Sequence, residues 1–244
     1  MKLSVVVPVH NEIDNIKPLI AEIVHALDDQ HDYEMIFVND ASTDHTLYQL
    51  KKMMQRYPHL RVLTHSICCG QSTALSTGIK AASSPVIATL DGDGQNDPKD
   101  IPELVKAFFA HQAEGEVIIA GYRKNRQDTK WKKISSKIAN TVRKTILNDD
   151  TLDTGCALKI FSKDLFLSLP YFDHMHRFLP ALAKRTGAKV ISVDVNHRPR
   201  AHGTSSYGTI DRLKAGLVDL AGVYWLMKRA KSPGVTEETI QNEQ

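Results

Sequence analysis

The residues with the clearest chemical potential are two aspartates in the segment TLDGDGQ, at positions 89–95. Asp91 and Asp93 follow the apolar run VIATL, which has the composition of a buried strand. Side chains two residues apart on an extended backbone point the same way, and glycines between and after them let a ligand approach closely. Such a carboxylate pair suits Mg²⁺ or Mn²⁺ together with substrate phosphates. We expect a site for a divalent ion and a diphosphate, the alternative being an ordinary Asp-Gly turn.

A second acidic segment, NDASTD at positions 39–44, follows another predicted strand. An acid just past a strand can accept hydrogen bonds from a base or a ribose, which is the role we expect for Asp40. Asp44 is instead a candidate for capping the next helix. The segment PVHNE, at positions 8–12, ends the first predicted strand and would lie beside Asp40, with helix capping as the alternative role of Glu12.

Cations dominate two further segments. HRPRAHGTSSYG, at positions 197–208, combines arginines, hydroxyls and glycines, which is typical of a loop that clasps phosphate and closes over it to exclude water. A plain basic surface loop is the alternative. For His197 and His202 we favour hydrogen-bonding or solvent roles over metal binding.

The other basic segment, positions 118–143, contains no glutamate and one aspartate, Asp128. Its cations are Arg123, Lys124, Arg126, Lys130, Lys132, Lys133, Lys137 and Arg143. A phosphate monoester, with a second pKa of about 6, is already largely ionised near neutral pH, and arginines can bind it through two hydrogen bonds. The cations of this segment therefore favour an anionic acceptor. A hydroxyl acceptor would need a carboxylate base, for which Asp153 is the candidate.

The elements that must position these residues alternate between strands and helices. Apolar, β-branched runs predict strands at 3–7, 33–38, 61–64, 85–90 and 116–120, and helical periodicity predicts helices at 12–27, 44–57, 70–82 and 98–112. This alternation predicts an α/β fold with a doubly wound, mainly parallel sheet and helices on both faces. Ligands then bind at the carboxyl ends of the strands, where the acidic residues fall. Beyond residue 121 we expect a basic helix at 129–147, strands at 157–161 and 190–195, and a helix at 210–228.

Length and composition set the remaining bounds. The 244 residues, 42% hydrophobic and 24% charged, are sufficient for one large domain with appendages, and a net charge of +3 does not indicate a nucleic-acid partner. The three cysteines make neither a disulfide framework nor a CxxC zinc motif, and no run is apolar enough for a signal peptide or a membrane span. We expect a cytoplasmic protein with reduced thiols.

The segment AGLVDLAGVYWLM, at positions 215–227, carries a single charge, Asp219, and has basic residues on both sides. Tyr224 and Trp225 between apolar and basic residues are typical of a membrane-interface anchor. Docking against the core and a homodimer seam are equally open. We expect residues 1–208 to form the main domain, residues 209–231 an amphipathic helix, and residues 232–244 a polar tail.

Seven segments, spread over roughly residues 3–210, carry a resemblance to a known family: VVVPVHNE, IFVNDASTD, GQSTALSTGIKAA, ATLDGDGQNDP, GYR, DTGCALKIF and HRPRAHGTSSYG. In this order they resemble a family 2 glycosyltransferase of the dolichol-phosphate mannosyltransferase and undecaprenyl-phosphate sugar transferase branch. The resemblance implies a GT-A fold and an inverting transfer of sugar from a UDP- or GDP-sugar to a polyprenyl or dolichyl phosphate. It also implies Mg²⁺ or Mn²⁺ as cofactor, and a place in cell-envelope glycan synthesis at the inner face of the membrane.

The resemblance assigns roles residue by residue. The nucleotide pocket would be lined by Pro8, Asn11, Glu12 and Asp40. Asp91 would contact the nucleotide and Asp93 the metal, with Gln95 nearby. The donor diphosphate and the acceptor phosphate would face Arg123, Arg200 and Ser205.

Three features depart from that branch. Cys68 stands where relatives often have asparagine, and Ser206 stands where they often have a lysine, which removes one candidate phosphate contact. The C-terminal membrane-spanning helices of many relatives have no counterpart in this sequence. A glycosyltransferase acting on a hydroxyl acceptor and a non-catalytic nucleotide-sugar-binding module remain as alternatives. A sugar nucleotidyltransferase is disfavoured because no glycine-rich loop follows the first strand, and the absence of GxGxxG argues against a dinucleotide-binding protein.

Overall fold

The computed structural model describes residues 2–28, 31–124, 143, 145–147, 151–200 and 209–231, with the backbone alone for residues 209–215. Within this part, seven strands form one sheet in the order β3-β2-β1-β4-β6-β5-β7. The strands are β1 (Lys2–Val9), β2 (Asp32–Asp40), β3 (Leu60–His65), β4 (Val86–Thr89), β5 (Val117–Tyr122), β6 (Lys159–Ser162) and β7 (Lys189–Asp194). All neighbouring pairs are parallel except those of β6, which runs antiparallel to β4 and β5.

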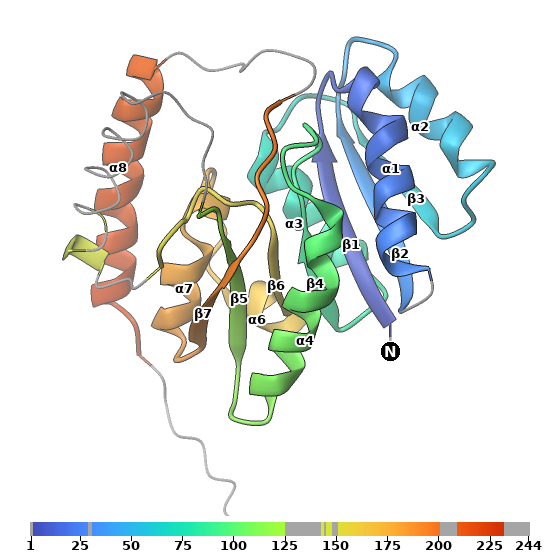
Figure 1. Ribbon diagram of the computed structural model, residues 1–244. Coiled ribbons are helices and arrows are strands. Elements are labelled where there is room, and N and C mark those ends of the chain that lie inside the picture. The colour runs from blue at the N-terminus through green and yellow to red at the C-terminus, as the bar shows by residue number, and fades with distance from the viewer. Residues whose placement is uncertain are drawn as a thin grey trace, which may run out of the picture.

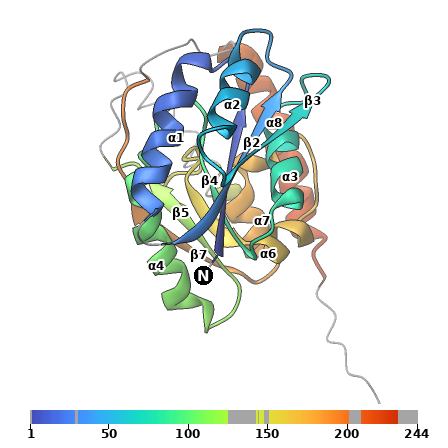
Figure 2. The ribbon, with the colours of Figure 1, turned by 90° about the vertical axis from the view of Figure 1, so that its right-hand side faces the viewer.

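Helices cover both faces of this sheet. The α-helices include α1 (Ile13–Leu27), α2 (Thr46–Met54), α3 (Gln71–Ala81), α4 (Ile101–Gln112), α6 (Lys163–Ser168), α7 (Leu179–Arg185) and α8 (Thr209–Lys228). Short 3₁₀ turns lie at η1 (Pro98–Asp100) and η2 (Met175–Arg177). One apolar core joins α1, α2 and α4 to the sheet, and a second joins α3, α6 and α7 to the opposite face (Figure 2).

Alternation along the strands explains the two cores. In β1, Val5 and Val7 face the first core, whereas Val6 faces the second. All three are fully buried, as expected for a strand covered by helices on both sides. The prediction of a doubly wound, mainly parallel α/β sheet is therefore confirmed.

The sheet differs from the expected one at β6. This strand comes late in the sequence but lies between β4 and β5, which therefore do not pair with each other. A strand was expected here, but its direction and neighbours depend on a long-range chain reversal that local periodicity does not encode. The short elements α6, η2 and α7, which follow β6, were not predicted. The basic helix expected at 129–147 lies mostly outside the described residues.

Helix α8 lies beyond α7, at the edge of the molecule (Figure 1). Val223 is buried against the second core, and the Arg185 guanidinium donates to the carbonyl of Leu226 at 3.0 Å. Asp219 accepts a hydrogen bond from His174 at 2.9 Å, so the single charge of the apolar segment is used for docking. No helix in the described ranges is long and apolar enough to cross a membrane.

A buried acid, Glu34, ties β2 to its neighbours. Its carboxylate accepts hydrogen bonds from Ser4 Oγ at 2.6 Å, from the Ser83 backbone and hydroxyl at 2.6 Å each, and from Arg61 at 2.5 Å. Burial alone would raise the pKa of Glu34, but these hydrogen bonds outweigh it and lower the pKa to about 2.

This depressed pKa predicts a pH dependence of stability. The stabilisation is fully present above the unfolded-state pKa of about 4.5 and is lost as the pH falls toward about 2. It amounts to roughly 2–3 kcal/mol in the free energy of unfolding near neutral pH. Glu34→Gln should therefore destabilise the protein clearly at about pH 6 and much less at about pH 3, as measured by urea unfolding. Glu103→Gln, at an exposed position of α4, is the matched control; parallel pH profiles for wild type and Glu34→Gln would contradict this account.

Candidate active site

The predicted site residues lie at one edge of the sheet. Val9 of β1 pairs with Asn39 of β2, and Val6 pairs with Thr89 of β4, so these parallel strands end together. Strand β6 is antiparallel to both β4 and β5, so β5 runs in the same direction as β4. The segments that follow β1, β2, β4 and β5 therefore meet at this edge.

The DGDG segment forms a turn directly after β4. Leu90 still donates its backbone N–H to the carbonyl of Val6, at 3.2 Å, before the chain leaves the sheet. Asp91 accepts a hydrogen bond from the Gln71 side chain, the first residue of α3, at 2.6 Å. Asp93 is 7% exposed and accepts the backbone N–H of Gln95 at 3.0 Å. The two carboxylates are thus held by different partners within one turn.

The glycines of this turn have backbone roles. A Cβ on Gly92 would lie 2.6 Å from Val9 Cγ1 and 3.0 Å from the carbonyl oxygen of Pro8. Gly94 has a φ of +72°, which favours glycine. The sequence suggested that these glycines leave room for a ligand; at Gly92 that room is instead taken by β1.

Arg200 contacts Asp93 directly. Its Nη2 donates to Asp93 Oδ2 at 2.5 Å, which joins the predicted phosphate-binding arginine to the predicted metal ligand. Glu12 lies in the same charged group. Burial is the main cause that raises the pKa of Glu12, while a hydrogen bond from Asn15 at 2.6 Å and the charge of Arg200 oppose it.

The electrostatics of the carboxylate pair fit a divalent cation. Burial of the carboxylate and, next, the negative charge of Asp93 raise the pKa of Asp91 to about 7. Positive charge on Lys159, Arg123 and Arg200 acts in the opposite direction. An ion between Asp91 and Asp93 would relieve their repulsion, and oxygen ligands are those that Mg²⁺ and Mn²⁺ prefer. Asp91 and Asp93 therefore suit the ion expected from the sequence.

Arg123, directly after β5, forms a two-point ion pair with Asp153. Nε lies 2.6 Å from Oδ2 and Nη2 lies 2.9 Å from Oδ1, and the backbone of Gly155 also donates to Oδ1. Burial would lower the pKa of Arg123, but Asp153 outweighs it and raises that pKa. Asp153, the candidate base of the sequence analysis, is thus engaged by a cation on both oxygens, which makes it a poor proton acceptor.

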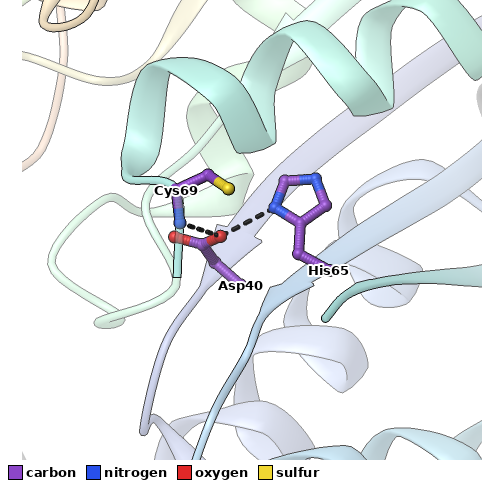
Figure 3. Close-up of side chains that lie close together, drawn as sticks. All are labelled: Asp40, His65 and Cys69. Atoms are coloured by element: carbon purple, nitrogen blue, oxygen red, sulfur yellow. Dashed lines mark hydrogen bonds and ion pairs between the residues drawn. The ribbon is translucent and has the colours of Figure 1, made fainter. Parts of the chain in front are cut away.

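The carboxylate of Asp40 accepts four hydrogen bonds, of which Figure 3 shows those from His65 and Cys69. It is 4% exposed, and its two oxygens accept from His65 Nδ1 at 2.7 Å, from Cys68 Sγ at 3.3 Å, and from the backbone N–H groups of Cys69 and Gly70 at 2.9 and 2.7 Å. Burial would raise the pKa of Asp40, but these hydrogen bonds outweigh it and lower the pKa. In this structure Asp40 organises the turn into α3.

Asn11 joins the ends of the first two strands. It has a φ of +57°, and its side-chain oxygen accepts from the backbone N–H of Thr43 at 2.8 Å and of Asp44 at 3.3 Å. Asp44 accepts from the N–H of Thr46 at 2.9 Å, the first residue of α2, in line with its expected capping role. Pro8 is buried within β1.

The remaining predicted residues are placed as follows. Gln95 donates through its side chain to the carbonyl of Arg198 at 3.4 Å, which connects the DGDG turn to the basic segment. Ser205 and His202 lie outside the described residues, as do the cations at positions 126–137. A shallow hollow of about 290 Å³ beside α1, walled by Glu22, Asp97 and Arg198 among others, contains none of the predicted site residues.

Two residues with contacts at this edge were not predicted. Gln71 donates to Asp91, and Lys159 lies 3% exposed at the start of β6, where its ammonium group donates to the carbonyl of Cys156. Burial lowers the pKa of Lys159, and the nearby charges of Cys156 and Asp91 oppose this. A lysine inside the otherwise apolar segment CALKIF was the available signal, because buried lysines are rare without a partner.

Comparison with known proteins agrees with this geometry. The family model described as glycosyl transferase family 2 matches residues 4–169. The chain belongs to glycosyl transferase family 2. As a glycosyltransferase of this family, it contains within the matched region both carboxylates of the DGDG turn and the Arg123–Asp153 pair.

Curated relatives give finer similarities. The glycosyltransferase is 36% identical over 239 residues to dodecaprenyl-phosphate galacturonate synthase of Rhizobium johnstonii, covering 96% of this chain and 70% of that protein. It is 30% identical over 209 residues to undecaprenyl-phosphate 4-deoxy-4-formamido-L-arabinose transferase of Edwardsiella ictaluri, covering 84% of this chain but 63% of that protein. It therefore spans less than two thirds of the second relative.

Solved structures support the fold. Glucosyl-3-phosphoglycerate synthase from Mycobacterium tuberculosis, crystallised with Mn²⁺, UDP-glucose and phosphoglyceric acid, superposes with a TM-score of 0.66 at 19% identity, covering 96% of this chain and 82% of that one. A mannosyltransferase from Pyrobaculum calidifontis in complex with GDP-Man and Mn²⁺ gives 0.69 at 17% identity, covering 95% and 65%. The fold of this glycosyltransferase is the GT-A fold.

The tight contact at Gly92 yields a prediction. In Gly92→Ala the added methyl group would clash with Val9 and with the Pro8 carbonyl, so the turn that carries Asp91 and Asp93 must shift. We expect a loss of roughly 1–3 kcal/mol in the free energy of unfolding, together with weaker binding of Mn²⁺. Urea unfolding and calorimetric titration with Mn²⁺ measure the two effects. Gly222→Ala in α8, where a Cβ would meet no atom within 4 Å, is the control: it should leave Mn²⁺ binding unchanged and should not destabilise the protein, because alanine has the higher helix propensity. A fully stable Gly92→Ala would refute the contact.

Proposed function

We propose that this glycosyltransferase moves a sugar from a UDP- or GDP-sugar to a polyprenyl phosphate, with inversion at the anomeric carbon and with Mg²⁺ or Mn²⁺ as cofactor. The observation that carries the proposal is the Asp91–Asp93 turn with Arg200 on Asp93, at the same strand edge as Arg123 and Lys159. The names of the two curated relatives, both polyprenyl-phosphate sugar enzymes, support the acceptor class. The Mn²⁺ and nucleotide-sugar complexes of the structural neighbours support the donor and the metal.

Asp91 and Asp93 would hold the ion, and Pro8, Asn11, Glu12, Asp40 and Gln95 would contribute to the donor pocket around it. When bound, the ion supplies positive charge that stabilises the departing nucleoside diphosphate. Arg200 already places a cation on Asp93, so we expect it to turn toward the diphosphate when donor and ion enter. Ser205 would assist from the same basic segment.

The acceptor step needs no protein base in this proposal. A phosphate monoester is already largely ionised near neutral pH, so its oxygen can attack the anomeric carbon directly, and one displacement inverts that centre. Arg123, held by Asp153, would orient the acceptor phosphate. A hydroxyl acceptor is less favoured because Asp153, the candidate base, is bound on both oxygens.

The deciding experiment measures nucleoside diphosphate release with purified protein, a UDP- or GDP-sugar and Mn²⁺. A polyprenyl phosphate should support turnover, whereas the corresponding polyprenyl alcohol should not. Turnover with the alcohol but not with the phosphate would favour the alternative hypothesis, transfer to a hydroxyl acceptor. Tight binding of nucleotide sugar without any turnover would favour a non-catalytic binding module.

Asp93→Asn tests the metal role. Losing one negative ligand should lower kcat/KM by at least about a hundredfold, and excess chelator should do the same to the wild type. Thermal unfolding should change little, because Asp93 lies in a turn after β4 and not within a strand. Glu103→Gln, an exposed charge removed from α4, is the matched control and should keep full activity. Unchanged turnover in Asp93→Asn would contradict the proposal.

We further propose that residues 209–231 contact the membrane surface as a unit appended to the domain of residues 1–208, followed by the polar segment 232–244. Leu217, Val218, Tyr224 and Trp225 are 59%, 73%, 44% and 58% exposed on α8. Lys228 lies over the Tyr224 ring at 5.6 Å, and Arg229 and Lys231 follow. Apolar and aromatic groups beside cations suit an anionic lipid surface. This would bring a peripheral enzyme to its lipid-linked acceptor.

Vesicle co-sedimentation checks this contact. The protein should bind vesicles that contain anionic lipid more strongly than neutral ones, and Trp225→Ser should lower the partition coefficient roughly fivefold, for a loss of about 1 kcal/mol. Tyr48→Ser, a 68% exposed aromatic on α2 near the opposite edge of the sheet, is the control. Equal losses in the two variants, or concentration-dependent dimers that disappear in Trp225→Ser, would point to another role for α8.

A further inference from the structure

A second group of ligand atoms lies at the turn between β3 and α3. The side chains of Asp40, His65 and Cys69 bring a carboxylate oxygen, an imidazole nitrogen and a sulfur within 4.8 Å of one another (Figure 3). They come from the end of β2, the end of β3 and the residue before Gly70. We propose that Asp40, His65 and Cys69 bind a thiophilic divalent cation, with Zn²⁺ as the ion whose chemistry they fit.

The ligand types separate this group from the DGDG turn. Asp91 and Asp93 offer oxygen atoms, the ligands of Mg²⁺ and Mn²⁺. A set of one carboxylate, one imidazole and one thiol is of the kind that Zn²⁺ binds, with a fourth position left for water. In a tetrahedral zinc site with bonds of roughly 2.0–2.3 Å, ligand atoms lie roughly 3.3–3.8 Å apart. In this structure the three ligand atoms lie within 4.8 Å of one another, and His65 Nδ1 lies 2.7 Å from Asp40 Oδ1. To reach the tetrahedral spacing, the Cys69 sulfur must move closer and the His65–Asp40 hydrogen bond must open by roughly 0.6 Å or more.

The three ligands are already positioned by other contacts. Asp40 is fixed by the N–H groups of Cys69 and Gly70, so the residue that supplies the sulfur is anchored to the residue that supplies the carboxylate. His65 Nε2 lies 2.9 Å from Thr77 Oγ1. A metal-bound histidine commonly donates its other ring N–H to such a neighbour, which fixes the ring.

The protons balance without an additional base. A carboxylate only accepts hydrogen bonds, so in this structure His65 carries its proton on Nδ1 and donates it to Asp40. On ion binding that proton moves to Nε2, where Thr77 Oγ1 accepts it, and Nδ1 becomes a ligand. The Cys69 thiol releases one proton to solvent as its sulfur binds the ion. Cys68 contacts the other oxygen of Asp40 and is not part of the set.

Cobalt(II), a coloured substitute for Zn²⁺, gives the test on the whole protein under reducing conditions. Wild type should show a thiolate-to-cobalt charge-transfer band that one equivalent of Zn²⁺ removes, with about one proton released per Zn²⁺ in calorimetry across buffers of different ionisation enthalpy. Cys69→Ser should abolish the band and weaken Zn²⁺ binding at least about tenfold. Cys68→Ser, one residue away, and Asp93→Asn, in the DGDG turn, should retain it.

The outcomes separate cleanly. A band that survives in Cys69→Ser, or a wild type that binds Co²⁺ without a thiolate band, overturns the proposal. Loss of the band in Cys68→Ser would place Cys68 among the ligands and overturn the proposed three-residue set. Because no arm measures sugar transfer and the titrations contain no nucleotide, failure here leaves the proposed glycosyl-transfer reaction untouched. The two proposals share Asp40, so a bound ion would compete with the donor for that carboxylate.

Discussion

Buried negative charge at the carboxyl edge of the sheet is the constraint on which the site depends. Parallel strands bring Asp40, Asp91 and Asp93 to one edge, where Asp40 and Asp93 are buried and Asp91 is partly buried, and burial makes an uncompensated carboxylate costly. Each carboxylate is hydrogen-bonded by a different partner: Asp40 by backbone N–H groups and His65, Asp91 by the amide of Gln71, and Asp93 by Arg200.

These partners fall into two kinds with different consequences. Asp40 is satisfied by groups of its own scaffold, so it stabilises the turn into α3 whether or not a ligand is bound. Asp91 and Asp93 are only partly compensated, and the pKa of Asp91 stays raised, to about 7, by burial and by Asp93. The negative charge that remains on Asp91 and Asp93 can attract a metal ion and a cationic arginine.

The antiparallel strand β6 contributes positive charge to this edge and helps to hold a neighbouring arginine in place. By lying between β4 and β5 it places Lys159 opposite Thr89 and Ala120, at the level where the DGDG turn begins. The segment that leads into β6 supplies Asp153, which holds Arg123 by two hydrogen bonds. The same insertion therefore provides a buried lysine and a fixed arginine, and it engages the carboxylate that could have served as a base.

The sequence by itself placed the strand ends to within two residues, and with them Asp40, Asp91, Asp93 and Arg123 at or just past those ends, because apolar periodicity and the polar residues that interrupt it are local signals. It also indicated the family, through ordered motifs. The tertiary structure alone decided the partners: Arg123 with Asp153, Arg200 with Asp93, and Gly92 against β1. Those pairs join residues far apart in the chain or follow from one close backbone approach, so they depend on strand order and on the direction of β6, which no local pattern specifies.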